Sequence, residues 1–401
     1  MIHRSRHWRY LAREGERRVR HYLRTRISGY PDRGTPPEAA RWILSERASA
    51  GLIAGGHFRG VWPRDLCFAT PGFRAAGYDE PLRATGDWLV AVCCESDVFR
   101  TDVHETYAAA TPSAGVDTFP ALVILLAEAD RLTANGDAIA SLASAHRRQF
   151  FDDRRSIVTG NGSSWWDSAA RARETYNTAM LLAAVGRLAD RSIETTYTGL
   201  GPEIRDGLLT HLWTGTHFAE HRESTVLACD ANVVPLYLDL VDEERTRSIV
   251  RALDRLETEH GLRIRERPFS RTAVHPYFVC HRDYHYHVWP WNSLMYANAT
   301  YRDGFRRRAA RERERVASSV REHGTFLEVV SLSGRPYARL GYASAGDFTV
   351  AAALWMELAE RRGTIEEDFA SNGRAGRRSQ DGTTNEGTTT ASGSVVAGDR
   401  R

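Results

Sequence analysis

The alternation of short and long connections between helical segments constrains this chain more than any other feature. Apolar residues recur at the helical spacing i, i+3, i+4 and i+7 in several segments, as along Ala121, Leu125 and Leu132. Prolines open some of these segments and glycines separate others. The pattern predicts helices over residues 37–50, 65–77, 80–95, 117–134, 137–150, 174–189, 202–212, 230–240, 243–257, 290–301, 304–320 and 346–361.

The connections between these helices differ in length in a regular way. Short links near 78–79, 135–136, 241–242 and 302–303, and a somewhat longer one at 190–201, alternate with six long segments, at 51–64, 96–116, 151–173, 213–229, 258–289 and 321–345. Hairpins that cannot bury their apolar faces alone stack on their neighbours. We therefore expect an all-α, closed (α/α)6 toroid of six helical hairpins, with active-site loops at one end. An open helical solenoid is the alternative, but it would not place every unusual polar and aromatic cluster on the long connections.

The two ends of the chain differ from this central part. Residues 1–35 are rich in arginine but lack the apolar run of a secretory signal, so they predict a basic helical extension outside the barrel. The barrel itself is expected over residues 36–365. Residues 366–401 are mostly Gly, Ser, Thr and Arg with few large apolar side chains, which predicts a disordered tail.

Composition excludes several classes of partner and cofactor. The net charge of +3 is too small to predict nucleic-acid binding, and no run of about 18 apolar residues predicts a membrane span, so neither partner is expected. Five scattered cysteines without a CxxC pattern favour free thiols in a reducing, cytoplasmic compartment. His281, His285 and His287 lie close together, but no cysteine or carboxylate pattern accompanies them, so we expect neither a metal nor another cofactor. Oligomeric state cannot be predicted from the sequence.

A Trp-Trp-Asp stretch in the third long segment is the first candidate for chemistry. Trp165 and Trp166 precede Asp167, and Arg171 follows four residues later. Apolar walls around a carboxyl group raise its pKa, which suits a general acid working near neutral pH. Flat aromatic faces beside acids and arginines are also common in sugar-binding sites. The alternative is that Asp167 only caps the next helix.

The sixth long segment contains a second candidate carboxylate. Glu328 lies in the apolar run Phe326-Leu327-Glu328-Val329-Val330, where an unpaired charge is costly. One explanation is an ion pair with an arginine, and the other is a catalytic base. Inverting glycosidases use two carboxyl groups roughly 6.5–9.5 Å apart, one as acid and one as base. Asp167 and Glu328 fit these two roles, on loops expected on opposite sides of the ring.

Two further long segments combine tryptophans with polar residues. In the first, Trp62 precedes Arg64 and Asp65, which can donate to and accept from adjacent sugar hydroxyls. In the fifth, aromatic residues surround His287, Trp289 and Trp291, and favour a carbohydrate platform. The alternatives are a structural salt bridge at a helix start and a packed hydrophobic plug. The second long segment, with Asp102, His104 and Glu105, is expected to be a solvated loop.

Five short motifs occur in an order that resembles a known family. Trp62-Pro63-Arg64-Asp65, Ser164-Trp165-Trp166-Asp167, Asp230-Ala231-Asn232, Val288-Trp289-Pro290-Trp291 and Phe326-Leu327-Glu328 resemble the (α/α)6-barrel, or six-hairpin, glycoside hydrolases. The resemblance covers about residues 50–360. It is closest to the amylo-α-1,6-glucosidase domain of glycogen debranching enzymes, with glucoamylases related.

The resemblance implies both an activity and residue roles. It implies Asp167 as general acid, Glu328 as general base, and Trp62, Arg64, Asp65, Trp166, Arg171, His287, Trp289 and Trp291 as substrate-binding residues. We therefore expect an inverting, exo-acting glycoside hydrolase without a metal, releasing glucose from α-glucans or α-glucosides. The partner is then an oligosaccharide or polysaccharide. A catalytically silent glycan-binding barrel and a polysaccharide lyase or epimerase on the same fold are the alternatives.

Overall fold

Helices account for most of the ordered structure in this computed structural model. It describes residues 2–96, 99–103, 114–160 and 172–363. Within these ranges there are thirteen α-helices: α1 (Ile2–Ser28), α2 (Pro36–Ala50), α3 (Pro63–Ala75), α4 (Asp79–Cys94), α5 (Thr118–Glu128), α6 (Gly136–Phe150), α7 (Glu174–Ala189), α8 (Gly201–Leu212), α9 (Asp230–Tyr237), α10 (Glu243–Leu253), α11 (Pro290–Arg302), α12 (Arg306–His323) and α13 (Thr349–Arg361). The all-α prediction is confirmed.

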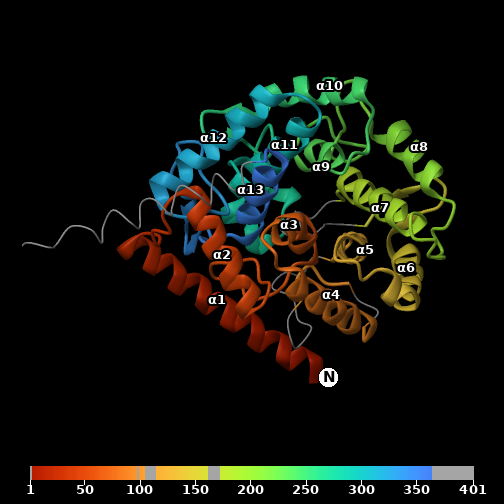
Figure 1. Ribbon diagram of the computed structural model, residues 1–401, viewed down its shortest axis with the longest axis horizontal. Helices are drawn as coiled ribbons and strands as arrows, with labels where there is room; N and C mark the ends of the chain where they lie inside the picture. The colour runs from red at the N-terminus through yellow and green to blue at the C-terminus, as the bar shows by residue number, and fades with distance from the viewer. Residues whose placement is uncertain (1, 97–98, 104–113, 161–171, 364–401) are drawn as a thin grey trace, which may run out of the picture.

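The odd-numbered helices from α3 to α13 form a closed inner ring. α3 contacts α5, α5 contacts α7, and the series continues through α9 and α11 to α13, which packs against α3 again. Figure 1 shows α2, α4, α6, α8, α10 and α12 outside this ring. The arrangement is therefore the predicted (α/α)6 toroid rather than an open solenoid.

Burial explains which helices take the inner positions. In α5 every residue from Thr118 to Ala127 is buried, because the helix packs on neighbours all around. By contrast, the outer helix α10 buries only four residues, spaced as one helical face: Thr246, Ile249, Val250 and Leu253. A helix that is apolar on all sides belongs inside, and an amphipathic helix covers it.

The connections follow the expected alternation. Each outer helix joins the next inner helix through a long connection, and three of these contain short antiparallel hairpins: β1 (Phe151–Asp152) with β2 (Ile157–Val158), β3 (Glu257–Thr258) with β4 (Gly261–Leu262), and β5 (Ala338–Arg339) with β6 (Tyr342–Ala343). Several helices end earlier than predicted, and the backbone explains two of these ends. α5 and α9 stop just before Asp130 (φ 56°) and Asp239 (φ 59°), whose left-handed backbone cannot continue a helix.

Helix α1 lies outside the two rings of helices, along one side of the barrel (Figure 1). The Tyr10 hydroxyl donates to Asp102 Oδ2 at 3.1 Å, and His21 Nε2 lies 2.9 Å from the carbonyl oxygen of Ser344. Because α1 covers it, Asp102 is fully buried, and the expectation that it lies in a solvated loop is wrong. In the described ranges, no helix has the length and apolar content needed to cross a membrane.

Candidate active site

A pocket opens where two inner helices begin and two long connections meet. It is lined from α3 and its preceding loop, from the α10–α11 connection, and from the α12–α13 connection, by Ala54, Phe58, Trp62, Arg64, Asp65, Tyr284, Trp289, Trp291, Glu328 and Phe348. Six of these are residues that the sequence selected: Trp62, Arg64, Asp65, Trp289, Trp291 and Glu328. The toroid thus brings three motifs together that lie up to 266 residues apart in the chain.

The same local device positions two of these motifs. Trp62 and Trp289 are the residues before α3 and α11, and Pro63 and Pro290 open these helices. Proline suits this position because the first helical N–H has no intrahelical partner and the ring fixes a helical φ. The residue before proline is held extended, so each tryptophan turns away from the helix axis and into the pocket wall. Both Trp-Pro pairs therefore act as helix starts that orient an indole.

Arg64 and Asp65 form a buried ion pair in the first turn of α3. Arg64 Nε donates to Asp65 Oδ1 at 2.6 Å, and the two residues are 6% and 5% exposed. Burial raises the pKa of Asp65, while Arg64 acts in the opposite direction and Asp117 adds to the rise. The salt bridge that the sequence analysis gave as the alternative to sugar binding is thus present, and the two residues that form it also line the pocket.

Aromatic faces make up much of the pocket wall. The rings of Trp289 and Trp291 lie 5.4 Å apart and nearly parallel, at 28°. The Arg64 guanidinium carbon is 5.5 Å from the Trp291 ring centroid, and Phe58 meets Trp62 edge to face at 5.2 Å. Such walls suit the flat apolar faces of a pyranose ring, while the ion pair suits its hydroxyls.

Glu328 provides the second carboxylate of the pocket. It lies in the α12–α13 connection, where its backbone N–H donates to Ala345 O at 2.8 Å, and it is 6% exposed. The Tyr284 hydroxyl donates to its Oε1, while the Tyr342 hydroxyl at 2.7 Å and the Ala345 N–H at 3.1 Å donate to its Oε2. In the described ranges Glu328 forms no ion pair. The arginine partner that the sequence analysis offered as one explanation is therefore absent there, and two tyrosine hydroxyls donate to the carboxylate instead.

Opposing effects set the protonation of Glu328. Burial raises its pKa above the ordinary value, and the hydrogen bonds from Tyr284, Tyr342 and Ala345 limit this rise because they favour the ionised form. A buried carboxylate with a raised pKa in a concave, aromatic pocket is a typical feature of a functional site. Among the described residues, Oε1 accepts one hydrogen bond, from Tyr284, and therefore keeps acceptor capacity for a further donor.

Sequence reasoning missed five residues of this site. Tyr284 and Tyr342 hold the carboxylate, and Ala54, Phe58 and Phe348 complete the wall. The aromatic density around Tyr284 was a signal in the sequence, but it did not distinguish Tyr284 from Tyr277 or Tyr286. Tyr342 lies on β6, fourteen residues after Glu328, and nothing in the sequence pairs them.

Of the other site residues that were selected from the sequence, His287 is the one within the described ranges. His287 does not line the pocket, and it is half-buried beside Asp283, with Nε2 3.9 Å from Asp283 Oδ2 and its ring 5.1 Å from that of Tyr337. Asp167, Trp166 and Arg171 lie outside the described residues, so their roles stay predictions. Among the described residues, no group of three His, Cys, Asp or Glu side chains could hold a metal ion.

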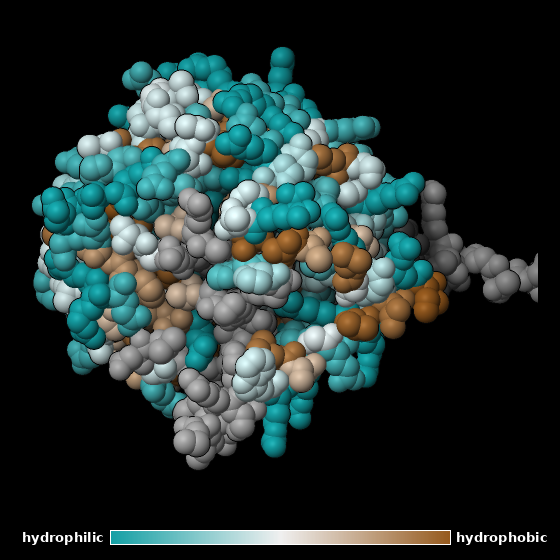
Figure 2. Space-filling view, turned by 180° about the vertical axis from the view of Figure 1, so that it is seen from behind, coloured by the Kyte–Doolittle hydropathy of each residue, from teal (hydrophilic) through white to brown (hydrophobic). Residues whose placement is uncertain are grey.

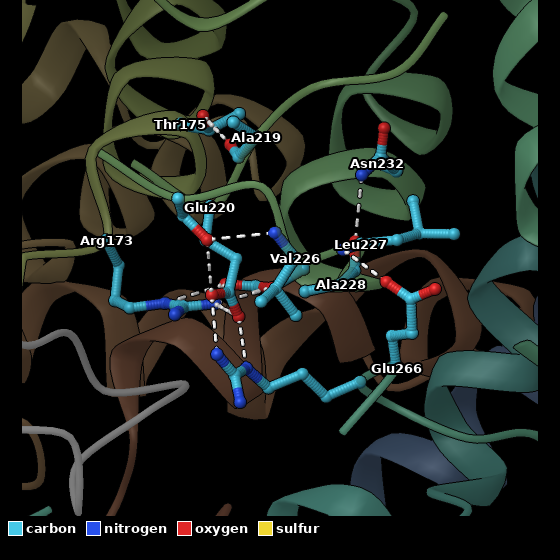
Figure 3. A network of polar contacts seen from close by, with 12 residues as sticks. Arg173, Thr175, Ala219, Glu220, Val226, Leu227, Ala228, Asn232 and Glu266 are labelled. Carbon is cyan, nitrogen blue, oxygen red and sulfur yellow. Dashed lines mark hydrogen bonds and ion pairs between the residues drawn. The ribbon is translucent and has the colours of Figure 1, made fainter. Parts of the chain in front are cut away.

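A buried ion network lies immediately after residues 161–171. Arg173 Nη2 contacts Glu220 Oε1 at 3.0 Å and Asp230 Oδ2 at 2.8 Å, and Arg265 Nη2 contacts Glu220 Oε2 at 2.8 Å. Figure 3 shows Glu220 pointing toward Arg173. Although burial alone would raise it, the pKa of Glu220 is lowered to about 2 by the two guanidinium groups. The network ties the third, fourth and fifth long connections to one another.

Comparisons with known proteins bear on the fold. No family model matches the chain, and no curated protein matches it in sequence. Among solved structures, a glycosidase variant aligns with a TM-score of 0.63 at 15% identity, over 88% of this chain and 98% of that one. A bacterial glucoamylase complexed with acarbose aligns with a TM-score of 0.59 at 12% identity, over 82% and 55% of the two chains.

A third solved structure of the same kind is a rhamnosidase from Klebsiella oxytoca with rhamnose bound. It aligns with a TM-score of 0.55 at 14% identity, over 84% of this chain and 66% of that one. The chain thus shares its all-α toroid fold with these glycosidase structures. At these identities the likeness extends to the fold alone.

Proposed function

We propose that this protein is a glycoside hydrolase, and specifically an inverting, exo-acting enzyme that releases glucose from α-glucans or α-glucosides. The observation that carries the proposal is the buried carboxylate of Glu328, held by two tyrosine hydroxyls and facing a pocket walled by tryptophans. The glycosidase structures of the same fold support it. An amylo-α-1,6-glucosidase-like or glucoamylase-like specificity follows from the sequence motifs.

Glu328 takes the role of general base in this proposal. An inverting base must be ionised to remove a proton from the attacking water. The donors on Glu328 favour that ionised form, and the free acceptor position on Oε1 can receive the water proton. A pKa above the ordinary glutamate range brings its basicity closer to that needed at neutral pH.

The remaining residues take binding and acid roles. Arg64 and Asp65 would hold adjacent hydroxyls of the terminal sugar, and Trp62, Trp289 and Trp291 would contact its faces. The Arg64–Asp65 pair is buried in the pocket wall, and exo action is proposed because binding of a terminal sugar there would use both residues. Asp167 is the proposed general acid, with Trp166 and Arg171 beside it in the sequence.

The proposal is tested with a panel of α-linked disaccharides, oligomaltosides and a branched limit dextrin. Wild-type protein is expected to release glucose from at least one of them, while Asp167→Asn and Glu328→Gln each lower the turnover at least a hundredfold. Wild-type turnover by both variants would refute the residue assignment. Sugar binding without any product would instead support a catalytically silent barrel, and an unsaturated or epimerised product would support a lyase or epimerase.

We also propose that the enzyme works in the reducing environment of the cytoplasm. All five cysteines are free, and the described structure contains none in a disulfide. Two of them, Cys94 and Cys280, are exposed, and an oxidising compartment would expose such thiols to unwanted pairing.

A further inference from the structure

Helix α1 exposes an apolar stripe on the face that points away from the barrel. Of the six large apolar side chains exposed in the described ranges, four belong to α1: Trp8 at 69%, Val19 at 51%, Leu23 at 53% and Ile27 at 84%. Val19, Leu23 and Ile27 follow one another at i, i+4 and i+8, so they lie on one face of the helix. Figure 2 shows apolar surface exposed among hydrophilic side chains on this side of the molecule.

This stripe is not the face that attaches α1 to the protein. Tyr10 and Glu14, at 8% and 2% exposure, lie on the opposite face, and the Tyr10 hydroxyl donates to Asp102. His21 on the same inner side contacts Ser344 O. The inner face thus attaches α1 to the barrel. The outer stripe takes no part in this attachment and is exposed to solvent.

The charges around the stripe indicate what could cover it. α1 contains nine arginines and two glutamates. Seven of these arginines have a described side chain, and five of the seven are exposed: Arg9, Arg13, Arg20, Arg24 and Arg26. The neighbouring β5–β6 hairpin, whose β6 strand contacts α1, also exposes Leu340 at 69%, directly after the exposed Arg339.

A second copy of the chain is a poor match to this surface. Apposing two α1 helices would bring many arginines of like charge together, which is unfavourable. A helix that combines arginines with exposed tryptophan and aliphatic side chains is typical of proteins bound at an anionic lipid surface. There the arginines contact lipid phosphates, and the apolar side chains enter the boundary between headgroups and acyl chains.

We propose that the outer face of α1 binds the surface of an anionic membrane, with Val19, Leu23 and Ile27 inserted and the flanking arginines on lipid phosphates. Binding of this kind is peripheral and needs no spanning segment. It is independent of the proposed glycosidase activity, because none of these side chains lines the pocket.

The test is co-sedimentation of the full-length protein with vesicles of phosphatidylglycerol or of phosphatidylcholine. The wild-type protein is expected to bind the anionic vesicles at least tenfold more tightly than the zwitterionic ones, and less tightly as salt is raised. Leu23→Glu/Ile27→Glu is expected to lower binding to the anionic vesicles at least tenfold. Arg20→Gln/Arg24→Gln should reduce the preference for anionic lipid while leaving the stripe in place.

A matched control separates the stripe from a simple change of net charge. Ser141→Glu/Thr210→Glu adds the same two negative charges at exposed positions of α6 and α8, on the far side of the barrel from α1 in Figure 1, and should bind as the wild type does. No binding to anionic vesicles, or equal binding by the wild type and the Leu23/Ile27 variant, would overturn the proposal. So would light scattering that shows a wild-type dimer which the same variant dissociates, because the occupant would then be a second copy.

Discussion

At the scale of single residues, the tyrosines around Glu328 control whether its carboxylate can act as a base. Tyr342 and Tyr284 come from different connections, and the hydroxyl group of each donates a hydrogen bond to one oxygen of Glu328. Burial raises the pKa of Glu328, and these donors limit the rise. The acidic limb of the activity profile should therefore lie above the ordinary glutamate range and depend on both hydroxyls.

Removing one of these donors should move that limb in a known direction. Tyr342→Phe keeps the ring but deletes a donor to the ionised form, so the pKa of Glu328 rises further. Since the base works only when ionised, activity on the acidic side is lost at a higher pH, shifted by about one pH unit. The measurement is the pH dependence of kcat/KM.

Tyr337→Phe is the control for this shift. Its hydroxyl donates to Asp283 at 3.2 Å rather than to Glu328, while its ring lies in the same aromatic cluster, 5.5 Å from that of Tyr284. This variant should keep the wild-type acidic limb. Equal shifts in both variants would show that ring packing, not the hydrogen bond, sets the profile.

At the scale of elements, the buried pairs between long connections hold the loop end of the barrel together. Glu220 accepts from Arg173 and Arg265, both of which are almost fully buried. Removing one partner of such a network leaves a buried charge uncompensated. The network is therefore more sensitive to substitution than the surface ion pairs on α10 or α12.

Glu220→Gln should lower the free energy of unfolding by about 3–5 kcal/mol. The pKa of Glu220 is about 2 in the folded protein against an ordinary 4.5, so its ionised form stabilises the fold above about pH 4.5, and this contribution is lost as pH falls toward 2. Urea unfolding at pH 7 and at pH 3 measures both effects, and the variant should differ less from the wild type at the lower pH. Glu243→Gln removes an exposed pair with Arg247 and should cost less than about 1 kcal/mol at either pH. Equal costs for the two variants would contradict the role of burial.

The sequence predicted elements better than it predicted which of their faces are exposed. Helical spacing and the positions of proline located the helices, because local preferences set these features. The partner of Tyr10 could not be predicted, because Asp102 is buried only when α1 packs on the barrel. The same holds for Tyr342, which reaches Glu328 only through the fold of the β5–β6 hairpin. His287 was selected from its aromatic neighbours, but its ring lies beside Asp283 and Tyr337 and does not line the pocket.

At the scale of the whole molecule, closure of the inner ring depends on a close approach of α3 and α13. A Cβ atom at Gly72 would lie 1.9 Å from the carbonyl oxygen of Ala353, so only glycine fits between these helices. The order and spacing of helices predicted a closed ring, and hence contact between its first and last inner helices, but not the glycine that this contact requires at position 72. Since α3 carries Arg64 and Asp65, the same contact also positions the pocket.

Gly72→Ala should destabilise the protein by about 3 kcal/mol or more, because the backbone of α3 or α13 must shift. Gly186→Ala in α7 is the control, since nothing lies within 4 Å of its added Cβ atom. That variant should gain roughly 0.5–1 kcal/mol from the better helix propensity of alanine. Urea unfolding midpoints compare the two, and a neutral Gly72→Ala would contradict the tight closure of the ring.

The central claim is that Glu328 is the base of an inverting glycoside hydrolase, and the anomeric form of the first product tests it most directly. Proton NMR during hydrolysis of an α-glucoside should show β-glucose first with the wild-type protein, and product formation at least a hundredfold slower with Glu328→Gln. The variant should remain folded and melt at or above the wild-type temperature at neutral pH, because a carboxylate whose pKa burial raises is costly when ionised. Release of α-glucose first, or wild-type rates from Glu328→Gln, would contradict the claim.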